Sequence, residues 1–201
     1  MSETGSIKFI AERSAATIGP FVGLEDLNTY RTKIRQLGLL GVDEKGIGFG
    51  NISVRDGTSA RFYITGSGSG RKTELMLTDC ARVMAYDLAR NWVRFEGGAM
   101  PSSESLTHAA IYAAEQTVGA VIHFHSSNLW NAILAEAPTT PEDVEYGTPG
   151  MARAVQHLFA ETNVREKKAF AMAGHREGVI AFGHNLAESY EALIRGTDAD
   201  R

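Results

Sequence analysis

The sequence predicts a domain of the α/β or α+β class, in which helices cover a largely antiparallel sheet. Segments with alternating apolar and polar residues dominate the middle of the first half, and helical and strand-like segments are mixed in the second half. The chain has 201 residues, of which 43% are hydrophobic and 22% charged, and this suits one globular core. We find no internal repeat and no linker rich in Pro, Gly or Ser. We therefore expect a single domain over residues 1–201, with residues 1–23 as an N-terminal arm.

The first half of the chain begins its regular structure with one helix and continues with two strand pairs. Apolar residues at helical spacing between Leu24 and Leu37 predict the helix, and Gly38 marks its end. The first strand pair alternates around Asp56-Gly57, a dipeptide typical of hairpin turns, and the second pair turns near Ala89. The strands are expected at residues 51–55, 60–65, 83–88 and 91–96.

The second half mixes helices with apolar strands. Helical spacing follows Pro101, and the apolar run that ends in two histidines is typical of a buried strand. Helices are expected at residues 104–114, 126–136, 151–159 and 186–194. Strands are expected at residues 119–125, 168–174 and 178–183.

The charge pattern excludes two classes of partner. The formal net charge is -4 at pH 7, and no block of Lys or Arg occurs, so we expect neither a nucleic acid nor an anionic membrane as a partner. No stretch reaches the roughly 18 consecutive apolar residues of a membrane span, and residues 1–14 lack the apolar core of a secretory signal. The single cysteine, Cys80, excludes an internal disulfide and suits a small buried hydrophobe. We expect a cytoplasmic protein that acts on a small molecule.

The run Val121–His125 carries two histidines separated by one residue on a predicted strand. Because side chains alternate along a strand, His123 and His125 project to one face and Phe124 to the other. Two neutral imidazoles at this spacing can bind one divalent cation. Histidines that are hydrogen-bonded in a core or exposed on an edge strand show the same spacing, so this motif alone leaves both interpretations open.

A catalytic metal site commonly has three protein ligands and one open position. His175 lies in a glycine-flanked turn between two apolar strands, from which its side chain can point across the sheet. We therefore regard His175 as the candidate third ligand. His157 on a helix and His184 before a helix are expected at the surface.

The residues Pro101–Glu104 open a predicted helix with two serines and an acid. In the plain interpretation, the hydroxyls of Ser102 and Ser103 and the charge of Glu104 stabilise the first helical turn. A helix N-terminus with two hydroxyls can also bind an anion, and Glu104 can act as a general acid or base. His108 follows at i+4 on the same face and could fix the Glu104 side chain.

The segment Gly66–Gly70, which includes Ser67 and Gly68, alternates glycine with serine after a predicted strand. Such a loop lets backbone N–H groups approach a phosphate closely. It fits neither the Walker A motif nor the dinucleotide fingerprint, so alone it is a weak signal. Asn51, which follows a glycine, would by itself be interpreted as a turn residue.

In this order, the elements resemble the class II aldolase/adducin family, which includes fuculose-phosphate and rhamnulose-phosphate aldolases and ribulose-phosphate epimerase. The resemblance covers the chain from about Gly46 to Ile194. The motifs that carry it are GNIS, ITGSG, PSSE followed by three residues and His, the H-x-H strand, YGTP, and a later His before a V-I-A strand.

The resemblance implies a three-layer α/β fold and a divalent metal, with zinc expected and manganese, cobalt or iron as alternatives. It implies that His123, His125 and His175 bind the metal and that Glu104 exchanges a proton with the substrate. The positions that hold the substrate phosphate in the sugar-phosphate members correspond to Asn51, Ser67, Gly68, Ser102 and Ser103. Many members are tetramers with the site at a subunit interface, so a homotetramer is expected.

The sequence departs from the sugar-phosphate aldolases next to two of these motifs. Arg176 and Glu177 follow His175, where those enzymes have glycine directly after the ligand. The stretch between His125 and Tyr146 is shorter than in those aldolases, where it carries a tyrosine acid, and Tyr146 matches a different family tyrosine. The metal-binding half is retained, and the substrate-binding half is altered.

These features favour a metal-dependent lyase of the aldolase type, which would stabilise an enediolate of a small phosphorylated hydroxy-carbonyl compound. A dehydratase, decarboxylase or epimerase on the same metal platform is the alternative, because a fold does not determine a reaction. A non-catalytic assembly module like the adducin head is less favoured, because a scaffold has no need of three histidines and Glu104.

Overall fold

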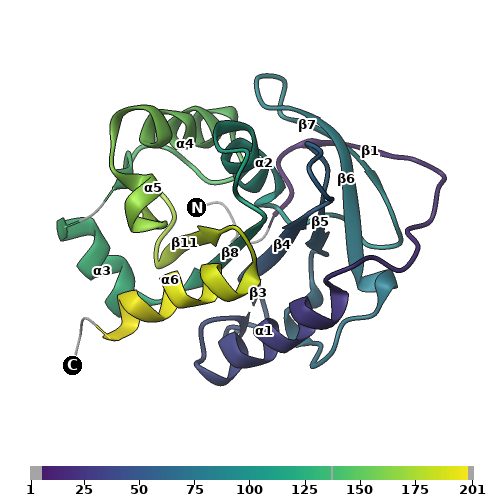
Figure 1. Ribbon diagram of the computed structural model, residues 1–201, viewed down its shortest axis with the longest axis horizontal. Coiled ribbons are helices and arrows are strands. Elements are labelled where there is room, and N and C mark those ends of the chain that lie inside the picture. The colour runs from purple at the N-terminus through teal and green to yellow at the C-terminus, as the bar shows by residue number, and fades with distance from the viewer. Residues whose placement is uncertain (1–5, 137, 199–201) are drawn as a thin grey trace.

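The computed structural model describes residues 6–136 and 138–198, which form a nine-stranded sheet between two groups of helices (Figure 1). The strand order is β1-β7-β6-β5-β4-β8-β11-β10-β9. These strands are β1 Ile10–Arg13, β4 Asn51–Arg55, β5 Phe62–Thr65, β6 Cys80–Asp87, β7 Trp92–Glu96, β8 Ala120–His125, β9 Thr139–Thr140, β10 Ala169–Met172 and β11 Gly178–Gly183. The α-helices are α1 Leu24–Gln36, α2 Ser105–Ala114, α3 Ser127–Glu136, α4 Pro149–Glu161, α5 Val164–Lys167 and α6 Leu186–Asp198.

Neighbouring strands run antiparallel except at the two edges, where β1 pairs with β7 and β9 pairs with β10 in parallel. The two expected hairpins are β4–β5 and β6–β7. The predicted mostly antiparallel sheet flanked by helices is therefore confirmed. A separate two-stranded sheet, β2 Gly41–Val42 with β3 Gly48–Phe49, was not predicted, because strands of two residues carry no readable alternation.

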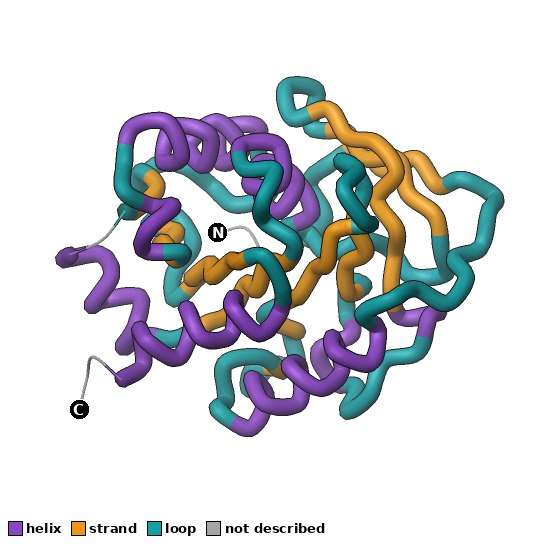
Figure 2. The backbone as a smooth tube through the Cα atoms, in the orientation of Figure 1, coloured by secondary structure: helices purple, strands orange, loops and turns teal. Residues whose placement is uncertain are grey.

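The sheet separates two hydrophobic cores, and Figure 2 shows the strands between an upper and a lower group of helices. Helices α2 and α4 contribute to one core, and α1, α3 and α6 contribute to the other. Along β8, Val121 belongs to the core under α2, whereas Ile122 and Phe124 belong to the opposite core. By the same alternation, His123 and His125 share one face of the sheet, as the sequence predicts, and the structure shows that α2 covers this face.

The segment expected as an N-terminal arm is attached to the sheet at several points, among them the stacking of the Phe21 ring on the Tyr63 ring of β5. Its residues 10–13 pair with β7, and Phe9 is buried in the core under α2. Cys80 is buried at the start of β6, as its interpretation as a small hydrophobe predicts. Within the described residues, no helix combines the length and the hydrophobicity that a membrane span requires.

Candidate active site

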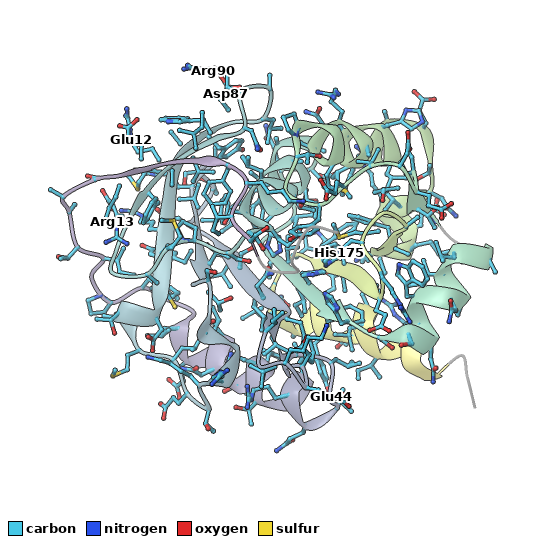
Figure 3. The ribbon with its side chains drawn as sticks, turned by 180° about the vertical axis from the view of Figure 1, so that it is seen from behind. Glu12, Arg13, Glu44, Asp87, Arg90 and His175 are labelled. Carbon is cyan, nitrogen blue, oxygen red and sulfur yellow. The ribbon has the colours of Figure 1, made fainter. Side chains whose placement is uncertain are left out.

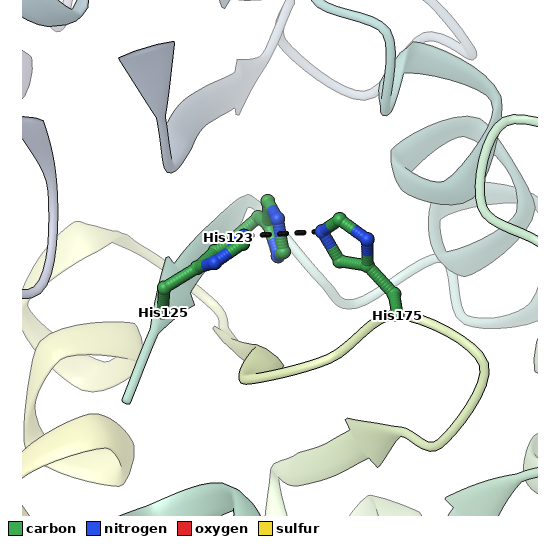
Figure 4. Close-up of side chains that lie close together, drawn as sticks. All are labelled: His123, His125 and His175. Carbon is green, nitrogen blue, oxygen red and sulfur yellow. Dashed lines mark hydrogen bonds between the residues drawn. The ribbon is translucent and has the colours of Figure 1, made fainter. Parts of the chain in front are cut away.

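Three histidines from two parts of the chain converge on one point. His123 and His125 lie on β8, and His175 lies in the turn between β10 and β11 (Figure 4). Their candidate ligand nitrogens all lie within 4.8 Å of one another. In Figure 3, His175 lies in the interior, whereas Glu12 and Arg90 lie at the periphery. The structure thus brings the predicted triad together.

A glycine makes room for the third histidine. Gly178 lies opposite His125 in the β8–β11 ladder. A Cβ atom at this position would overlap the imidazole ring of His175. The ring therefore occupies the space above Gly178, next to the His125 ring, and the two Nε2 atoms are 3.0 Å apart. The two extra residues after His175 are accommodated in the turn and do not displace its side chain from the cluster.

The histidine cluster fits a divalent cation by its protonation pattern. The Nδ1 atom of His123 lies 3.2 Å from the carbonyl oxygen of Val179, which can only accept a hydrogen bond. Nδ1 therefore carries the proton, and Nε2 keeps its lone pair for a metal. Two nitrogens bound tetrahedrally to zinc at about 2.05 Å would lie about 3.3 Å apart. The 3.0 Å separation of His125 and His175 is within a few tenths of an ångström of this value.

Burial keeps these histidines neutral, which is the state that binds a metal. It lowers the pKa of His123 well below its ordinary value, and His125 and His175 lower it further. Burial also lowers the pKa of His125 to about 4, although the nearby Glu177 carboxylate opposes this shift. The pKa of His175 falls to about 3, mainly through burial, and His125 and the Lys8 ammonium lower it further.

Glu104 lies at the N-cap position of α2 and is only 2% exposed. Burial raises its pKa to about 7, against the opposing effects of the Thr107 hydrogen bond and the Lys8 ammonium. The Thr107 hydroxyl donates to Glu104 Oε2 over 2.7 Å, and Oε1 has no partner among the described residues. A carboxyl group with a pKa near neutrality can both accept and donate a proton at physiological pH.

The expectation that His108 fixes Glu104 is wrong, because Thr107 holds the carboxylate. His108 Nδ1 instead lies 2.7 Å from the Ser53 hydroxyl, which also lies 2.7 Å from the Tyr112 hydroxyl. His108 is buried, and its pKa is lowered to about 3 by desolvation. This neutral network lies between β4 and α2 and links the two elements that carry Asn51 and Glu104.

A cavity of about 170 Å³ contains the histidine triad and Glu104. Asn51 lies opposite His123 in the β4–β8 ladder, so the two side chains share a face. Asn51 Oδ1 is buried without a partner among the described residues, as is Glu104 Oε1. All the predicted site residues line this cavity: Asn51, Ser67, Gly68, Ser102, Ser103, Glu104, His123, His125 and His175.

The glycine-rich loop differs from the predicted cradle of free backbone N–H groups. The N–H groups of Gly66, Ser67 and Ser69 donate to the carbonyl oxygens of Asp79, Met100 and Gly66. These three N–H groups are therefore not available to an anion. The loop can still offer an anion side-chain hydroxyl groups, such as that of Ser67, and its remaining N–H groups. Gly68 has a left-handed backbone, with φ 77°, which favours glycine at this bend.

Cations behind this loop were not found from the sequence. Arg31 of α1 is 1% exposed and donates to the carbonyl oxygens of Ser69 (2.8 Å) and Thr73 (3.1 Å). Arg35 donates to the carbonyl oxygen of Gly70. The pKa of Arg31, lowered to about 10 by burial and by Arg35, still keeps it charged. The helical spacing of the sequence predicts that Arg31 lies on a helix, but it does not predict which carbonyl groups its side chain contacts.

The two charged residues that follow the glycine-rich loop, Arg71 and Lys72, bind partners outside the cavity. The Arg71 guanidinium donates to the Gly46 carbonyl oxygen over 3.0 Å. The Lys72 ammonium pairs with Asp79 at 2.6 Å. Neither residue lines the cavity. Arg31 and Arg35 do not line the cavity either, but they donate directly to carbonyl oxygens of the loop and so place positive charge against its backbone.

Tyr146 forms the wall beside His175, and the two ring centroids are 4.6 Å apart. The Tyr146 hydroxyl lies 3.3 Å from the Ser6 hydroxyl, on the side of the N-terminal segment. With its hydroxyl group on this side, Tyr146 is not identified as the acid for a leaving carbonyl group. Lys8 contacts the same tyrosine, and neither Ser6 nor Lys8 carries a motif that would reveal this from the sequence.

Residues 34–196 match the family described as Class II Aldolase and Adducin N-terminal domain. This chain belongs to the class II aldolase and adducin family. The match spans the triad, Glu104 and the glycine-rich loop, so the resemblance seen in the motifs is confirmed. As a member of this family, the chain is assigned to metal-dependent enzymes, and the histidine triad is in place for a divalent metal.

Two similar proteins have curated names. The chain is 37% identical over 173 residues to the methylthioribulose-1-phosphate dehydratase of Leptospira biflexa serovar Patoc, covering 72% of this chain and 80% of that protein. It is 29% identical over 163 residues to the 3-oxo-tetronate 4-phosphate decarboxylase of Haemophilus influenzae, covering 71% of this chain and 70% of that protein.

Solved structures share the class II aldolase fold. An L-fuculose 1-phosphate aldolase superposes with a TM-score of 0.64 at 22% identity, covering 90% of this chain and 86% of that one. A sugar-phosphate aldolase from Thermotoga maritima superposes with a TM-score of 0.64 at 17% identity, covering 88% and 91%. At these identities, the likeness confirms the predicted three-layer fold and does not by itself assign a reaction.

Proposed function

We propose that this class II aldolase family member is a divalent-metal-dependent dehydratase that acts on a phosphorylated ketose. The observation that carries the proposal is one cavity that holds three neutral histidines and a buried carboxyl group with a pKa near 7. His123, His125 and His175 would hold the cation, with zinc favoured by the three-imidazole donor set. The cation would polarise the substrate carbonyl and stabilise the charge that develops on its oxygen.

Glu104 would move the proton. Its carboxylate takes a proton from the carbon next to the substrate carbonyl, and the C–H electron pair forms the double bond of an enediolate. The carboxyl group then returns the proton to a hydroxyl group that leaves from the following carbon as water. The C–O bond breaks in this step, and the enol that remains becomes a ketone. One carboxyl group, whose pKa burial raises, would serve for both transfers.

Two arguments favour the loss of water over C–C cleavage. The relative at 37% identity is named as a dehydratase, whereas the aldolases are similar to this chain in fold alone. Aldol cleavage also needs a second acid–base group for the carbonyl product that leaves. Tyr146, the tyrosine among the described residues of the cavity wall, has its hydroxyl beside Ser6. An aldolase of the same substrate class is the second candidate, favoured by the fold neighbours.

The phosphate would bind at the end of the cavity formed by the glycine-rich loop and the start of α2. Hydroxyl groups of Ser67, Ser102 and Ser103 line this end, and Asn51 adds an amide. Arg31 beneath the loop supplies positive charge. The names of both curated relatives denote phosphorylated keto compounds, which supports a substrate of this class.

The test is to follow metal-loaded enzyme by NMR with ribulose 1-phosphate and 5-methylthioribulose 1-phosphate. We expect a dehydrated diketone phosphate from at least one of them, and no product from Glu104→Gln. Formation of dihydroxyacetone phosphate with an aldehyde would instead support the aldolase. The proposal fails if the metal-loaded enzyme neither binds nor converts any ketose phosphate.

A further inference from the structure

A second cavity opens next to the histidine triad. It has a volume of about 620 Å³ and shares His125 and the Ile47–Phe49 segment with the first cavity. The rest of its lining comes from Gly38, Leu39, Asp43, Ser126, Ser127, Asn128, Arg176 and Glu177. The loop residues 66–70 line only the first cavity. His125 thus lies between a cavity lined by the glycine-rich loop and a second, larger one.

The backbone of Glu177 indicates that its side chain has a role. Its φ is 65°, in the left-handed region that favours glycine. Its carbonyl oxygen accepts the Ser126 N–H over 2.9 Å. Its carboxylate accepts the Ser127 hydroxyl over 2.8 Å. A glutamate that is held from two sides in a strained conformation points to a function for the carboxylate, because glycine would adopt this backbone without strain.

Arg176 adds positive charge to the same wall. Its Nε atom lies 3.8 Å from Glu177 Oε1, and its side chain is 88% exposed. This single long contact leaves most of its N–H groups free to donate. Asp43 adds a second carboxylate to the cavity lining. The wall therefore presents both donors and acceptors of hydrogen bonds, next to the point where the substrate would meet the metal ligands.

Hydroxyl groups fit this wall because each one both donates and accepts a hydrogen bond. An apolar group would remove water from the Arg176 and Glu177 charges without replacing its hydrogen bonds. A site that pairs with a substrate hydroxyl therefore rejects an analogue that lacks it. The methylthio group in the name of the Leptospira relative's substrate has no hydroxyl donor.

We propose that the second cavity binds the end of the substrate farthest from the phosphate, and that this end carries hydroxyl groups recognised by Glu177 and Arg176. This assignment rests on the proposed function, because it assumes that the phosphate lies at the glycine-rich loop. The substrate would then be a ketose phosphate with an unmodified hydroxylated tail. Arg176 and Glu177, the insertion after His175, would be the residues that set this specificity.

The test measures affinity by calorimetry in metal-loaded Glu104→Gln, which blocks turnover. The ligands are ribulose 1-phosphate and 5-deoxyribulose 1-phosphate, which differ only in the terminal hydroxyl. We expect ribulose 1-phosphate to bind about tenfold more tightly, as for one well-made hydrogen bond to a charged group. Glu177→Gly, added to the Glu104→Gln protein, should abolish this preference. It should not lower the midpoint of thermal unfolding, because glycine suits the left-handed backbone.

The matched control is Lys168→Gly, which also replaces a left-handed residue (φ 56°) but lies outside both cavities. The preference should survive in this control. Two results would overturn the assignment while leaving the proposed function intact. One is equal affinity of Glu104→Gln for the two ligands, and the other is a preference that remains after Glu177→Gly is added. If neither ketose phosphate binds, the proposed function fails and the assignment fails with it.

Discussion

The ammonium of Lys8 lies 3.8 Å from the centroid of the Tyr146 ring and donates a hydrogen bond to the Tyr146 carbonyl oxygen over 3.0 Å. Lys8 also pairs with Glu145 at 3.2 Å. The Tyr146 ring also packs against the His175 ring, with 4.6 Å between the two ring centroids. A residue near the N-terminus therefore supports the wall that packs against a candidate metal ligand.

Lys8→Met should weaken metal binding about tenfold, in the range seen for residues that orient metal ligands. The loss of the cation–π contact and the hydrogen bonds would release Tyr146 and, through it, His175. Competition with a chelator measures the affinity. The matched control is Lys33→Met, because Lys33 lies over the Tyr30 ring at 4.7 Å and lines neither cavity. Equal metal affinities of the two variants would contradict the role of Lys8.

His123→Ala combined with His125→Ala should remove the metal. We expect about one divalent ion per chain in the unmodified protein purified without added metal, and almost none in the double variant. His184→Ala is the control, because His184 is exposed and bonded to Glu188. Elemental analysis of the three proteins decides the matter. Full occupancy in the double variant would show that the triad is not the metal site.

Glu104 should make the stability of the metal-free protein depend on pH. Its folded pKa, about 7, is raised from the ordinary 4.5. The folded state therefore holds this proton more tightly, and the stabilisation is complete below pH 4.5 and is lost as the pH rises through 7. Glu104→Gln cannot ionise, so its stability relative to the unmodified protein should rise over this window, by up to roughly 3 kcal/mol.

Urea unfolding of both metal-free proteins at pH 5 and pH 8 measures this difference. A stability difference that is the same at both pH values would show that Glu104 has an ordinary pKa. Activity provides a separate readout, because the removal of a general acid–base group should lower kcat by ~100-fold or more.

Arg31→Gln should weaken the binding of inorganic phosphate about tenfold, because it removes a buried charge beneath the glycine-rich loop. The measurement is the rise of the thermal midpoint with phosphate concentration. Arg71→Gln makes the same change of net charge within the loop, but its guanidinium contacts Gly46, so it should change the affinity less than about twofold. Arg31→Lys tests whether the charge itself matters, because it keeps the positive charge. This variant should recover part of the phosphate affinity that Arg31→Gln loses. Equal effects of Arg31→Gln and Arg71→Gln would contradict this prediction.

The family resemblance in the sequence implies a homotetramer, and we expect the protein to form one with closed symmetry. Analytical ultracentrifugation should give a mass near four times the 21.7 kDa of one chain. A single monomeric species at micromolar concentration would count against this assembly and against a site completed by a second subunit.

The sequence by itself determined the elements whose signals are local. Strand alternation was enough to place His123 and His125 on one face and Phe124 in the opposite core, because the side-chain period of a strand leaves no other choice. The Asp56-Gly57 dipeptide and its flanking alternation predicted the β4–β5 hairpin. The order of the motifs was specific enough to predict the family, and the residues that those motifs name line one cavity.

Only the tertiary structure decided how these parts meet. The ring of His175 reaches His125 because the β8–β11 register puts Gly178, which has no Cβ, beneath it. The carbonyl partners of Arg31 are 38 or more residues away along the chain, and Lys8 meets Tyr146 across 138 residues. Local periodicity contains no information on such pairs, because their geometry follows from the packing of separate helices and strands around the sheet.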